Sequence, residues 1–270
     1  MKKFAVIGNP INHSLSPQIH SEFARQYSID LLYEKILADD DKAFASIIQN
    51  LMDKGYSGVN VTLPFKICAA KISTTKTSEV DLTRSANTLS FNNNAIEAHT
   101  TDGIGLVNDL LEKIGTLANS SILLLGAGGA ANAVISSILS EKISNLYLWN
   151  RTIQKSFDMT QNWQKNYENI SVMDHIDLDK IDIVINATSA GIMDTASSPI
   201  SLNDSHKDLI CYDMMYGKQT PFLKSARENN LTLFDGLGML VKQAAASFEI
   251  WHEVKVESKS IEESLRSILI

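Results

Sequence analysis

A glycine-rich turn near the middle of the chain has the residue pattern of a site for a dinucleotide. The apolar segment 122–125 leads into Gly126-Ala127-Gly128-Gly129-Ala130-Ala131, and apolar residues then recur at helical spacing as far as Leu139. Between a strand and a helix, such glycines permit a tight turn and let the backbone approach a pyrophosphate closely. The N-terminus of the helix adds N–H groups without intrahelical partners and a partial positive charge. The turn therefore predicts a phosphate-binding loop.

The end of the next apolar segment indicates which dinucleotide this is. Segment 146–149 is followed by Asn150-Arg151-Thr152, with Lys155 close behind. An NAD site usually has Asp or Glu about 20 residues beyond the glycines, where the carboxylate binds the ribose hydroxyls, and no acid stands here. Arg151 can pair in a fork with a 2′-phosphate and stack on adenine, while Asn150 and Thr152 can donate hydrogen bonds. This chemistry predicts NADP.

Four further segments carry more polar side chains than turns require. They are residues 9–17, 58–66, 86–88 and 99–103. Taken alone, Ser16 can simply cap a helix that has Pro17 at its first position, and Asp102 can cap the helix that begins at Gly103. A single Lys66 after a strand would be solvated, but Asn60 and Thr62 stand beside it on the same segment.

The elements that must position these residues alternate between strand and helix patterns, which predicts an α/β protein with largely parallel sheets. A hairpin tip at 92–94 precedes a short strand at 96–98. The last apolar helical face runs from Leu237 to Trp251. Predicted strands cover 4–7, 33–37, 58–61, 88–91, 122–125, 146–149, 181–185, 209–212 and 231–234.

Length and composition limit the function classes. The 270 residues suffice for one large domain or two moderate ones. A net charge of −7 argues against a nucleic-acid partner, and no apolar stretch approaches the roughly 20 residues of a membrane span. Cys68 and Cys211 are too few for a disulfide framework or a metal cluster, so we expect reduced thiols in a cytoplasmic protein.

Taken in order, these segments resemble the shikimate dehydrogenase family over nearly the whole chain. The resemblance implies NADP-dependent interconversion of shikimate and 3-dehydroshikimate in aromatic amino acid biosynthesis. It also implies an N-terminal α/β substrate domain (1–102), a doubly wound Rossmann-type NADP domain (103–236), a cleft between them, and C-terminal helices (237–270) that return to the substrate domain. The motifs that carry it are Gly8-Asn9-Pro10, Ser14-Leu15-Ser16-Pro17, 60–66, Asn87-Thr88, Thr101-Asp102-Gly103, 126–130, 150–152, 186–191, 212–216, 220–223 and 235–245.

The resemblance assigns roles residue by residue. Lys66 matches the catalytic lysine and Asp102 its partner carboxylate; a lysine within hydrogen-bond reach of the reacting oxygen can both remove and return its proton. Ser14, Ser16 and Tyr216 match groups that hold the substrate carboxylate. The groups around the ring hydroxyls are Thr62, Asn87 and Gln243, with Asn60 lining the same pocket. The cofactor residues are Gly126, Ala127, Gly128, Gly129, Ala130, Asn150, Arg151, Thr152, Lys155, Thr188, Met214 and Gly236, and no metal is implied.

Two departures from the family pattern flank the catalytic pair. The chain has Arg84-Ser85-Ala86 where the family commonly has Gly-Ala-Val, and Thr100 where an Asn usually precedes Thr-Asp. They leave open the alternative of a dual quinate/shikimate dehydrogenase that accepts NAD. Arg151 argues against a preference for NAD. A non-catalytic NADP-binding sensor is a further alternative, although it would not need both Lys66 and Asp102. The small-molecule substrate is the expected partner, and a monomer or a weak homodimer are both open.

Overall fold

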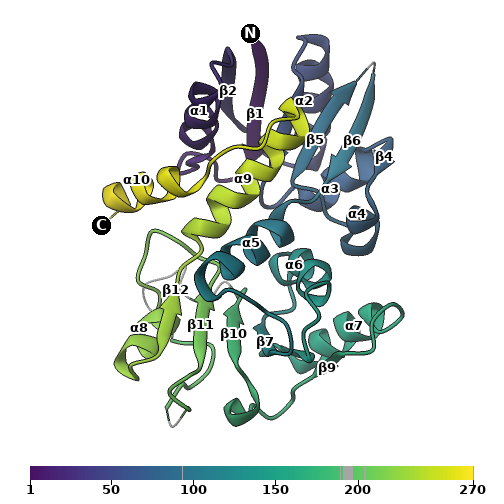
Figure 1. The fold of residues 1–270 in the computed structure, drawn as a ribbon. Helices are drawn as coiled ribbons and strands as arrows, with labels where there is room; N and C mark the ends of the chain where they lie inside the picture. Colours follow the sequence, from purple (N-terminus) through teal and green to yellow (C-terminus); the bar gives the residue numbers. More distant parts are fainter. Residues whose placement is uncertain (93, 189, 191–196, 204, 270) are drawn as a thin grey trace. The chain divides into compact units, whose positions relative to one another are not determined.

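The structure, a computed structural model, divides the chain into two compact units (Figure 1). Unit 1 contains Met1–Gly105 and Leu240–Ile268, and unit 2 contains Leu106–Met239 with the last two residues. Among the helices of the described chain, none is both long and apolar enough to cross a lipid bilayer. The described residues are 1–92, 94–188, 190, 197–203 and 205–269.

Unit 1 is built on a mixed six-stranded sheet in the order β2-β1-β3-β5-β6-β4. Strand β1 pairs in parallel with β2 and β3, whereas β5 runs antiparallel to both of its neighbours. The predicted hairpin is therefore β5–β6, although Asn93 of its tip lies outside the described residues. The elements are β1 (Lys2–Gly8), α1 (Ser16–Gln26), β2 (Leu31–Leu37), α2 (Asp41–Asp53), β3 (Gly58–Val61), α3 (Lys66–Ile72), β4 (Thr75–Lys76), α4 (Ser78–Thr83), β5 (Thr88–Asn92), β6 (Ala95–His99), α9 (Leu237–His252) and α10 (Lys259–Leu269). Helix α5 (Asp102–Ile114) begins in unit 1 and belongs to unit 2 from Leu106 onward.

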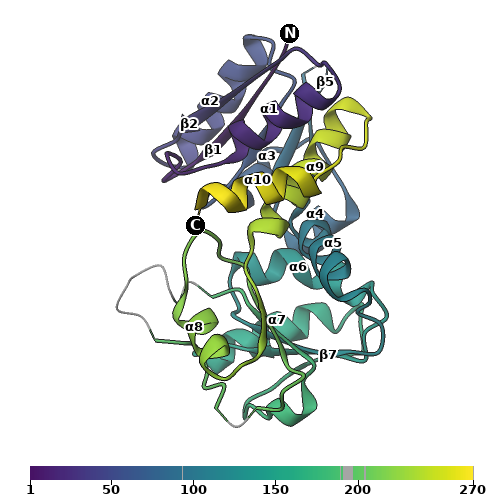
Figure 2. The ribbon, with the colours of Figure 1, turned by 60° about the vertical axis from the view of Figure 1, so that its left-hand side comes forward.

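Alternating side chains of β1 serve two separate cores, because successive residues of a strand point to opposite faces of the sheet. Phe4 and Val6 pack in a cluster with Trp251 of α9, while Ala5 and Ile7 join a cluster that contains residues of α2 and α3. Helices α1 and α9 thus cover one face of the sheet, and α2 and α3 cover the other (Figures 1 and 2).

Unit 2 has the strand order that defines a doubly wound dinucleotide fold. All six strands are parallel in the order β9-β8-β7-β10-β11-β12, which is the 3-2-1-4-5-6 order whose direction reverses between the first and fourth strands. The predicted α/β class is confirmed. The elements are β7 (Ser121–Leu125), α6 (Gly129–Leu139), β8 (Asn145–Trp149), α7 (Ile153–Trp163), β9 (Ile170–Val172), η1 (Leu178–Lys180), β10 (Ile183–Asn186), β11 (Ile210–Asp213), α8 (Pro221–Glu228) and β12 (Thr232–Phe234).

Two layers of helices bury this sheet. Ile122 and Leu124 of β7 pack in a cluster with residues of α5 and α6, whereas Leu123 and Leu125 pack with residues of α8. Both faces of the strand are fully buried, which explains why its sequence is a continuous apolar run rather than an alternating one. The predicted strands match the observed ones to within two residues at each end, and in the part of the chain that the structure describes only the short edge strands β4 and β9 were missed.

A histidine is buried in the aromatic core of unit 1. His20 of α1 is 1% exposed and stacks on Tyr33, with 4.4 Å between the ring centroids. Phe23 and Phe248 pack near the same ring, and neither imidazole nitrogen has a hydrogen-bond partner in the described chain. Burial lowers the pKa of His20 from 6.5 to about 3, and the nearby His252 adds to this effect.

This burial predicts that unit 1 loses stability as the pH falls below 6.5. In that range the unfolded chain binds a proton at His20 that the folded chain does not bind, so the free energy of unfolding decreases with falling pH. We expect the slope between pH 6.5 and 5 to be lower in H20F than in the wild type, by up to about 1.4 kcal/mol per pH unit. The free energy of unfolding of both proteins is measured by urea denaturation at each pH.

The test compares the slopes of the free energy of unfolding against pH rather than the absolute stabilities, because H20F also changes core packing. The control is H175Q, which replaces an exposed histidine of unit 2. Equal slopes in H20F and the wild type would contradict the prediction.

Candidate functional site

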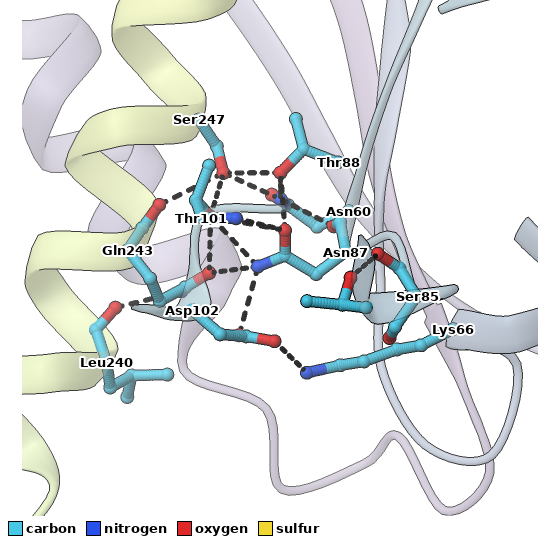
Figure 3. A network of polar contacts seen from close by, with 11 residues as sticks. Asn60, Lys66, Ser85, Asn87, Thr88, Thr101, Asp102, Leu240, Gln243 and Ser247 are labelled. Atoms are coloured by element: carbon cyan, nitrogen blue, oxygen red, sulfur yellow. Dashed lines mark hydrogen bonds and ion pairs between the residues drawn. The ribbon is translucent and has the colours of Figure 1, made fainter. Parts of the chain in front are cut away.

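In unit 1, the predicted catalytic pair forms a close ion pair. Lys66 is the first residue of α3 and Asp102 the first residue of α5. The Lys66 Nζ donates to Asp102 Oδ2 at 2.6 Å, and the two side chains are 21% and 10% exposed (Figure 3). Asp102 thus does more than begin a helix, because its carboxylate accepts a hydrogen bond from the Lys66 side chain.

The second oxygen of Asp102 is held by Asn87, whose side-chain orientation is fixed by the backbone. The N–H of Thr101 donates to Asn87 Oδ1 at 2.8 Å. Since a backbone N–H can only donate, Nδ2 of Asn87 must point the other way, where it donates to Asp102 Oδ1 at 3.1 Å. The same Nδ2 lies 3.1 Å from Gln243 Oε1 of α9 (Figure 3). The amide therefore orients both the carboxylate and the glutamine.

Gln243 and Asn60 belong to the same network of polar side chains. The Gln243 Nε2 donates to the Leu240 carbonyl at 2.9 Å, so its oxygen faces Asn87. Asn60 is 5% exposed, and its Oδ1 accepts from the Tyr33 hydroxyl at 2.7 Å. The structure thus brings four of the predicted residues, namely Lys66, Asn87, Asp102 and Gln243, into direct contact and places Asn60 in the layer beneath them.

The loop before α1 carries the predicted carboxylate-binding serines. The Ser14 hydroxyl donates to Ser16 Oγ at 3.2 Å and accepts from the Ser16 N–H at 3.3 Å. The interpretation of Ser16 as a helix cap is wrong, because α1 begins at Ser16 itself. Leu15 occupies the cap position and makes no side-chain bond. Ser16 is buried, and its hydroxyl accepts the hydrogen bond from Ser14 rather than capping α1.

Thr62 follows β3 and packs its methyl group against the end of β1. A Cβ atom on Gly8 would lie 2.3 Å from Thr62 Cγ2, so glycine is required there. Thr62 is half-buried and stands four residues before Lys66.

In unit 2, the glycine turn contains glycines of two kinds. Gly126 has φ +112°, and a Cβ on it would lie 3.2 Å from the Ala187 carbonyl group, so the backbone itself requires glycine. Gly128 has an extended backbone, and a Cβ on Gly128 or Gly129 would meet nothing within 4 Å. These two exposed glycines leave open space at the start of α6, which has no side-chain cap. This arrangement fits a pyrophosphate.

The strand register brings the residues that we predict to bind the 2′-phosphate close to this turn. Leu125 of β7 pairs with Trp149 of β8, and the Gly126 N–H donates to the Trp149 carbonyl at 2.7 Å. Arg151 and Lys155 are both exposed, and Arg151 forms no ion pair with the described residues. The Asn150 amide donates to the Thr152 carbonyl at 2.9 Å, which fixes the turn that presents Arg151.

A buried pair, Asn186 and Asp213, organises the remaining predicted cofactor residues of unit 2. Asn186 Nδ2 donates to Asp213 Oδ2 at 3.0 Å, and Asn186 Oδ1 accepts from the Thr188 hydroxyl at 2.7 Å. Burial raises the pKa of Asp213, whereas hydrogen bonds from Thr220, Met215 and Asn186 oppose that shift. The positioning role of this pair was not predicted from the sequence, although both residues lie inside the motifs 186–191 and 212–216.

Asp213 also fixes the segment that carries Met214 and Tyr216. The Met215 N–H donates to Asp213 Oδ1 at 3.0 Å, and a Cβ on Gly236 would lie 2.2 Å from the Met214 carbonyl oxygen. Met214 and Gly236 are thus immediate neighbours. Burial raises the pKa of Tyr216, and its grouping with the two serines of unit 1 stays a prediction.

Comparisons with known proteins match three family models to successive segments of the chain. A model described as the shikimate dehydrogenase substrate binding domain matches residues 6–89, and one described as shikimate/quinate 5-dehydrogenase matches 109–213. The shikimate 5′-dehydrogenase C-terminal domain matches 236–266. The chain belongs to the shikimate dehydrogenase family.

Relatives and solved structures extend this membership over the full length. The NADP⁺-dependent shikimate dehydrogenase of Vesicomyosocius okutanii is 42% identical over 98% of this chain and 100% of its own. The crystal structure of shikimate dehydrogenase from Aquifex aeolicus has a TM-score of 0.90 and 30% identity, with 98% of both chains covered. That of the Thermus thermophilus enzyme with NADP(H) and shikimate has a TM-score of 0.88 and 26% identity, with 99% of both chains covered.

The two departures from the shikimate dehydrogenase pattern now have a structural context. Arg84, where the family commonly has Gly, ends α4 with a left-handed backbone, φ +53°. It is exposed, while Ala86 is buried and its N–H donates to the Lys66 carbonyl at 3.0 Å. The Thr100 hydroxyl is buried and has no partner in the described chain. The Lys66–Asp102 ion pair is formed with both departures present.

Proposed function

We propose that this chain interconverts 3-dehydroshikimate and shikimate with NADP as cofactor. The Lys66–Asp102 ion pair, held by an amide whose orientation the backbone sets, carries the proposal. When bound, the nicotinamide supplies or accepts the hydride. Lys66 gives a proton to the carbonyl oxygen during reduction of the ketone and takes it from the hydroxyl in the reverse direction. Asp102 keeps Lys66 in place and accepts a hydrogen bond from a neighbouring substrate hydroxyl.

The other polar groups of unit 1 hold and orient the substrate in this proposal. Ser14 and Ser16 bind the substrate carboxylate through neutral donors. Hydrogen bonds to a charged group contribute about 1.5–3 kcal/mol each, so such donors suffice without an arginine. Thr62, Asn87 and Gln243 contact the ring hydroxyls, and Asn60 supports them from beneath.

For NADP, the residues of unit 2 offer a phosphate loop and a cation. We assign the pyrophosphate to the turn Gly126–Ala130 and the 2′-phosphate to Arg151, with Asn150, Thr152 and Lys155 beside it. Thr188, Met214 and Gly236 lie along the parallel edge where such folds bind the nicotinamide half. We expect a cytoplasmic enzyme that is a monomer or a weak homodimer, which sedimentation velocity tests.

Turnover of two substrates with two cofactors tests the reaction directly. Purified protein is given shikimate or quinate with NADP⁺ or NAD⁺, and the absorbance of the reduced nicotinamide is followed. We expect oxidation of shikimate with a clear preference for NADP⁺. Turnover of neither substrate would support the non-catalytic sensor, whereas equal rates with NAD⁺ would contradict the role of Arg151.

Removal of the proton donor should affect kcat far more than cofactor binding. We expect K66A to lower kcat by roughly 10²–10⁴-fold, as for loss of a general acid and base. The NADP⁺ affinity, measured by calorimetry, should change little because Lys66 lies outside unit 2. K71A, on the last turn of the same helix and exposed, is the matched control. If K66A retained activity within a few-fold, Lys66 would not be the proton donor.

Because the space above the glycine turn is open, we predict that a substitution there can weaken NADP⁺ binding without lowering the stability of the ligand-free protein. We expect G129A to leave the unfolding temperature of the ligand-free protein unchanged or slightly raised, because alanine favours the first turn of α6. Its methyl group would occupy the space assigned to the pyrophosphate, so affinity for NADP⁺ should fall at least tenfold, about 1.4 kcal/mol.

G126A is the comparison variant, and it should destabilise the ligand-free protein because its backbone has positive φ. Undiminished NADP⁺ binding by G129A would place the pyrophosphate elsewhere.

A further inference from the structure

A buried serine of α9 joins the polar side chains that lie beneath the Lys66–Asp102 pair. Ser247 is fully buried, one helical turn beyond Gln243. Its Oγ lies 2.7 Å from Thr88 Oγ1 and 3.2 Å from Thr101 Oγ1. It also accepts from Asn60 Nδ2 at 3.0 Å and lies 3.0 Å from the Gln243 carbonyl (Figure 3). This hydroxyl of α9 thus contacts Asn60 of β3, Thr88 of β5 and Thr101, which follows β6.

The proton positions around Ser247 are restricted by two oriented amides. The Asn87 carbonyl lies 3.1 Å from Asn60 Nδ2 and can only accept, so this end of the amide donates and also faces Ser247 and Thr88. The Tyr33 hydroxyl donates to Asn60 Oδ1 at the other end. A hydroxyl has one proton and two lone pairs. With one lone pair used by Asn60, Ser247 keeps one lone pair and one proton for Thr88, Thr101 and the Gln243 carbonyl. Three groups therefore compete for the two remaining bonds.

The same competition extends to Asn87. Its Oδ1 accepts from the Thr101 N–H and also lies within reach of the hydroxyls of Thr88, at 3.2 Å, and Thr101, at 3.3 Å. Its Nδ2 donates to Thr101 Oγ1 at 2.9 Å in addition to Asp102. A threonine hydroxyl that donates its proton to Ser247 cannot donate that proton to Asn87 Oδ1. The serine thus reduces the number of donors that compete with the Thr101 N–H for this oxygen, while Nδ2 remains shared among Thr101 Oγ1, Asp102 and Gln243.

We propose that Ser247 is a positioning residue for the dehydrogenase reaction and acts through Asn87. This inference rests on the proposed function above. By binding the hydroxyls of Thr88 and Thr101, Ser247 holds Asn87 in the orientation that presents Asp102 to Lys66. Without the Ser247 hydroxyl, Thr88 and Thr101 can still bond to Asn87, so we expect the unit to stay folded. The Asn87 amide would then have more hydroxyl donors competing for its oxygen, and its orientation toward Asp102 would be less fixed.

Alanine and cysteine at position 247 test the hydroxyl and its volume separately. We expect S247A to lower kcat/KM for shikimate by about three- to tenfold, which corresponds to one lost hydrogen bond. S247C should show the same loss, because sulfur fills the space but is a weak donor and acceptor. The KM for NADP⁺ should stay within twofold. S90A is the matched control, since Ser90 is buried on β5, the strand of Thr88, and its hydroxyl has no partner in the described chain.

A double-mutant cycle with N87A separates positioning from a purely structural role. If Ser247 acts through Asn87, the S247A substitution should change kcat/KM less than twofold in the N87A background. An equal loss in both backgrounds would show that Ser247 supports the fold alone and would overturn the inference. Wild-type activity in S247A would overturn it as well. Inactivity of the wild type and S90A toward shikimate would instead contradict the proposed function.

Discussion

The hydrogen bond from the Thr101 N–H to Asn87 Oδ1 is the contact on which the geometry of the candidate site depends. An asparagine amide can rotate by half a turn and exchange a donor for an acceptor, with little change in shape. A backbone N–H removes that freedom because it can only donate. At 2.8 Å it directs the amide NH₂ toward Asp102. The reverse orientation would set the amide oxygen against a carboxylate, and the ion pair with Lys66 would lose its support.

The antiparallel strand β5 is what makes this contact possible. Asn87 precedes β5, and Thr88 pairs with Asn60 of β3 on one side and with His99 of β6 on the other. Side chains far apart in sequence therefore meet at one point of the sheet, next to the start of α5. Unit 2 follows a different rule, because its parallel strands all end at one edge, where the glycine turn and the Asn186–Asp213 pair lie.

Much of this could be predicted from the sequence, because the signals were local. The glycine turn, the cation after β8 and the strands of both sheets depend on residues close together along the chain. The Ser16 cap failed because Leu15 already has helical geometry, so the Ser-Pro pattern lies one residue inside the helix. Ser247 was missed because it stands on an otherwise apolar helical face, and its partners come from β3, β5 and the residue before α5. Only its spacing of four from Gln243 could have indicated it.

The polar layer beneath the ion pair is costly, and this supports a positional role. Leaving one buried polar group without a partner costs about 1–3 kcal/mol, and a well-packed apolar core would avoid that risk. Unit 1 does tolerate unpaired hydroxyls, since Ser90 and Thr100 have none among the described residues. Asn60 and Asn87, by contrast, use donors and acceptors alike. A layer so fully connected restricts the amides to one arrangement, and that restriction is what the proposed acid–base pair needs and an apolar core could not provide.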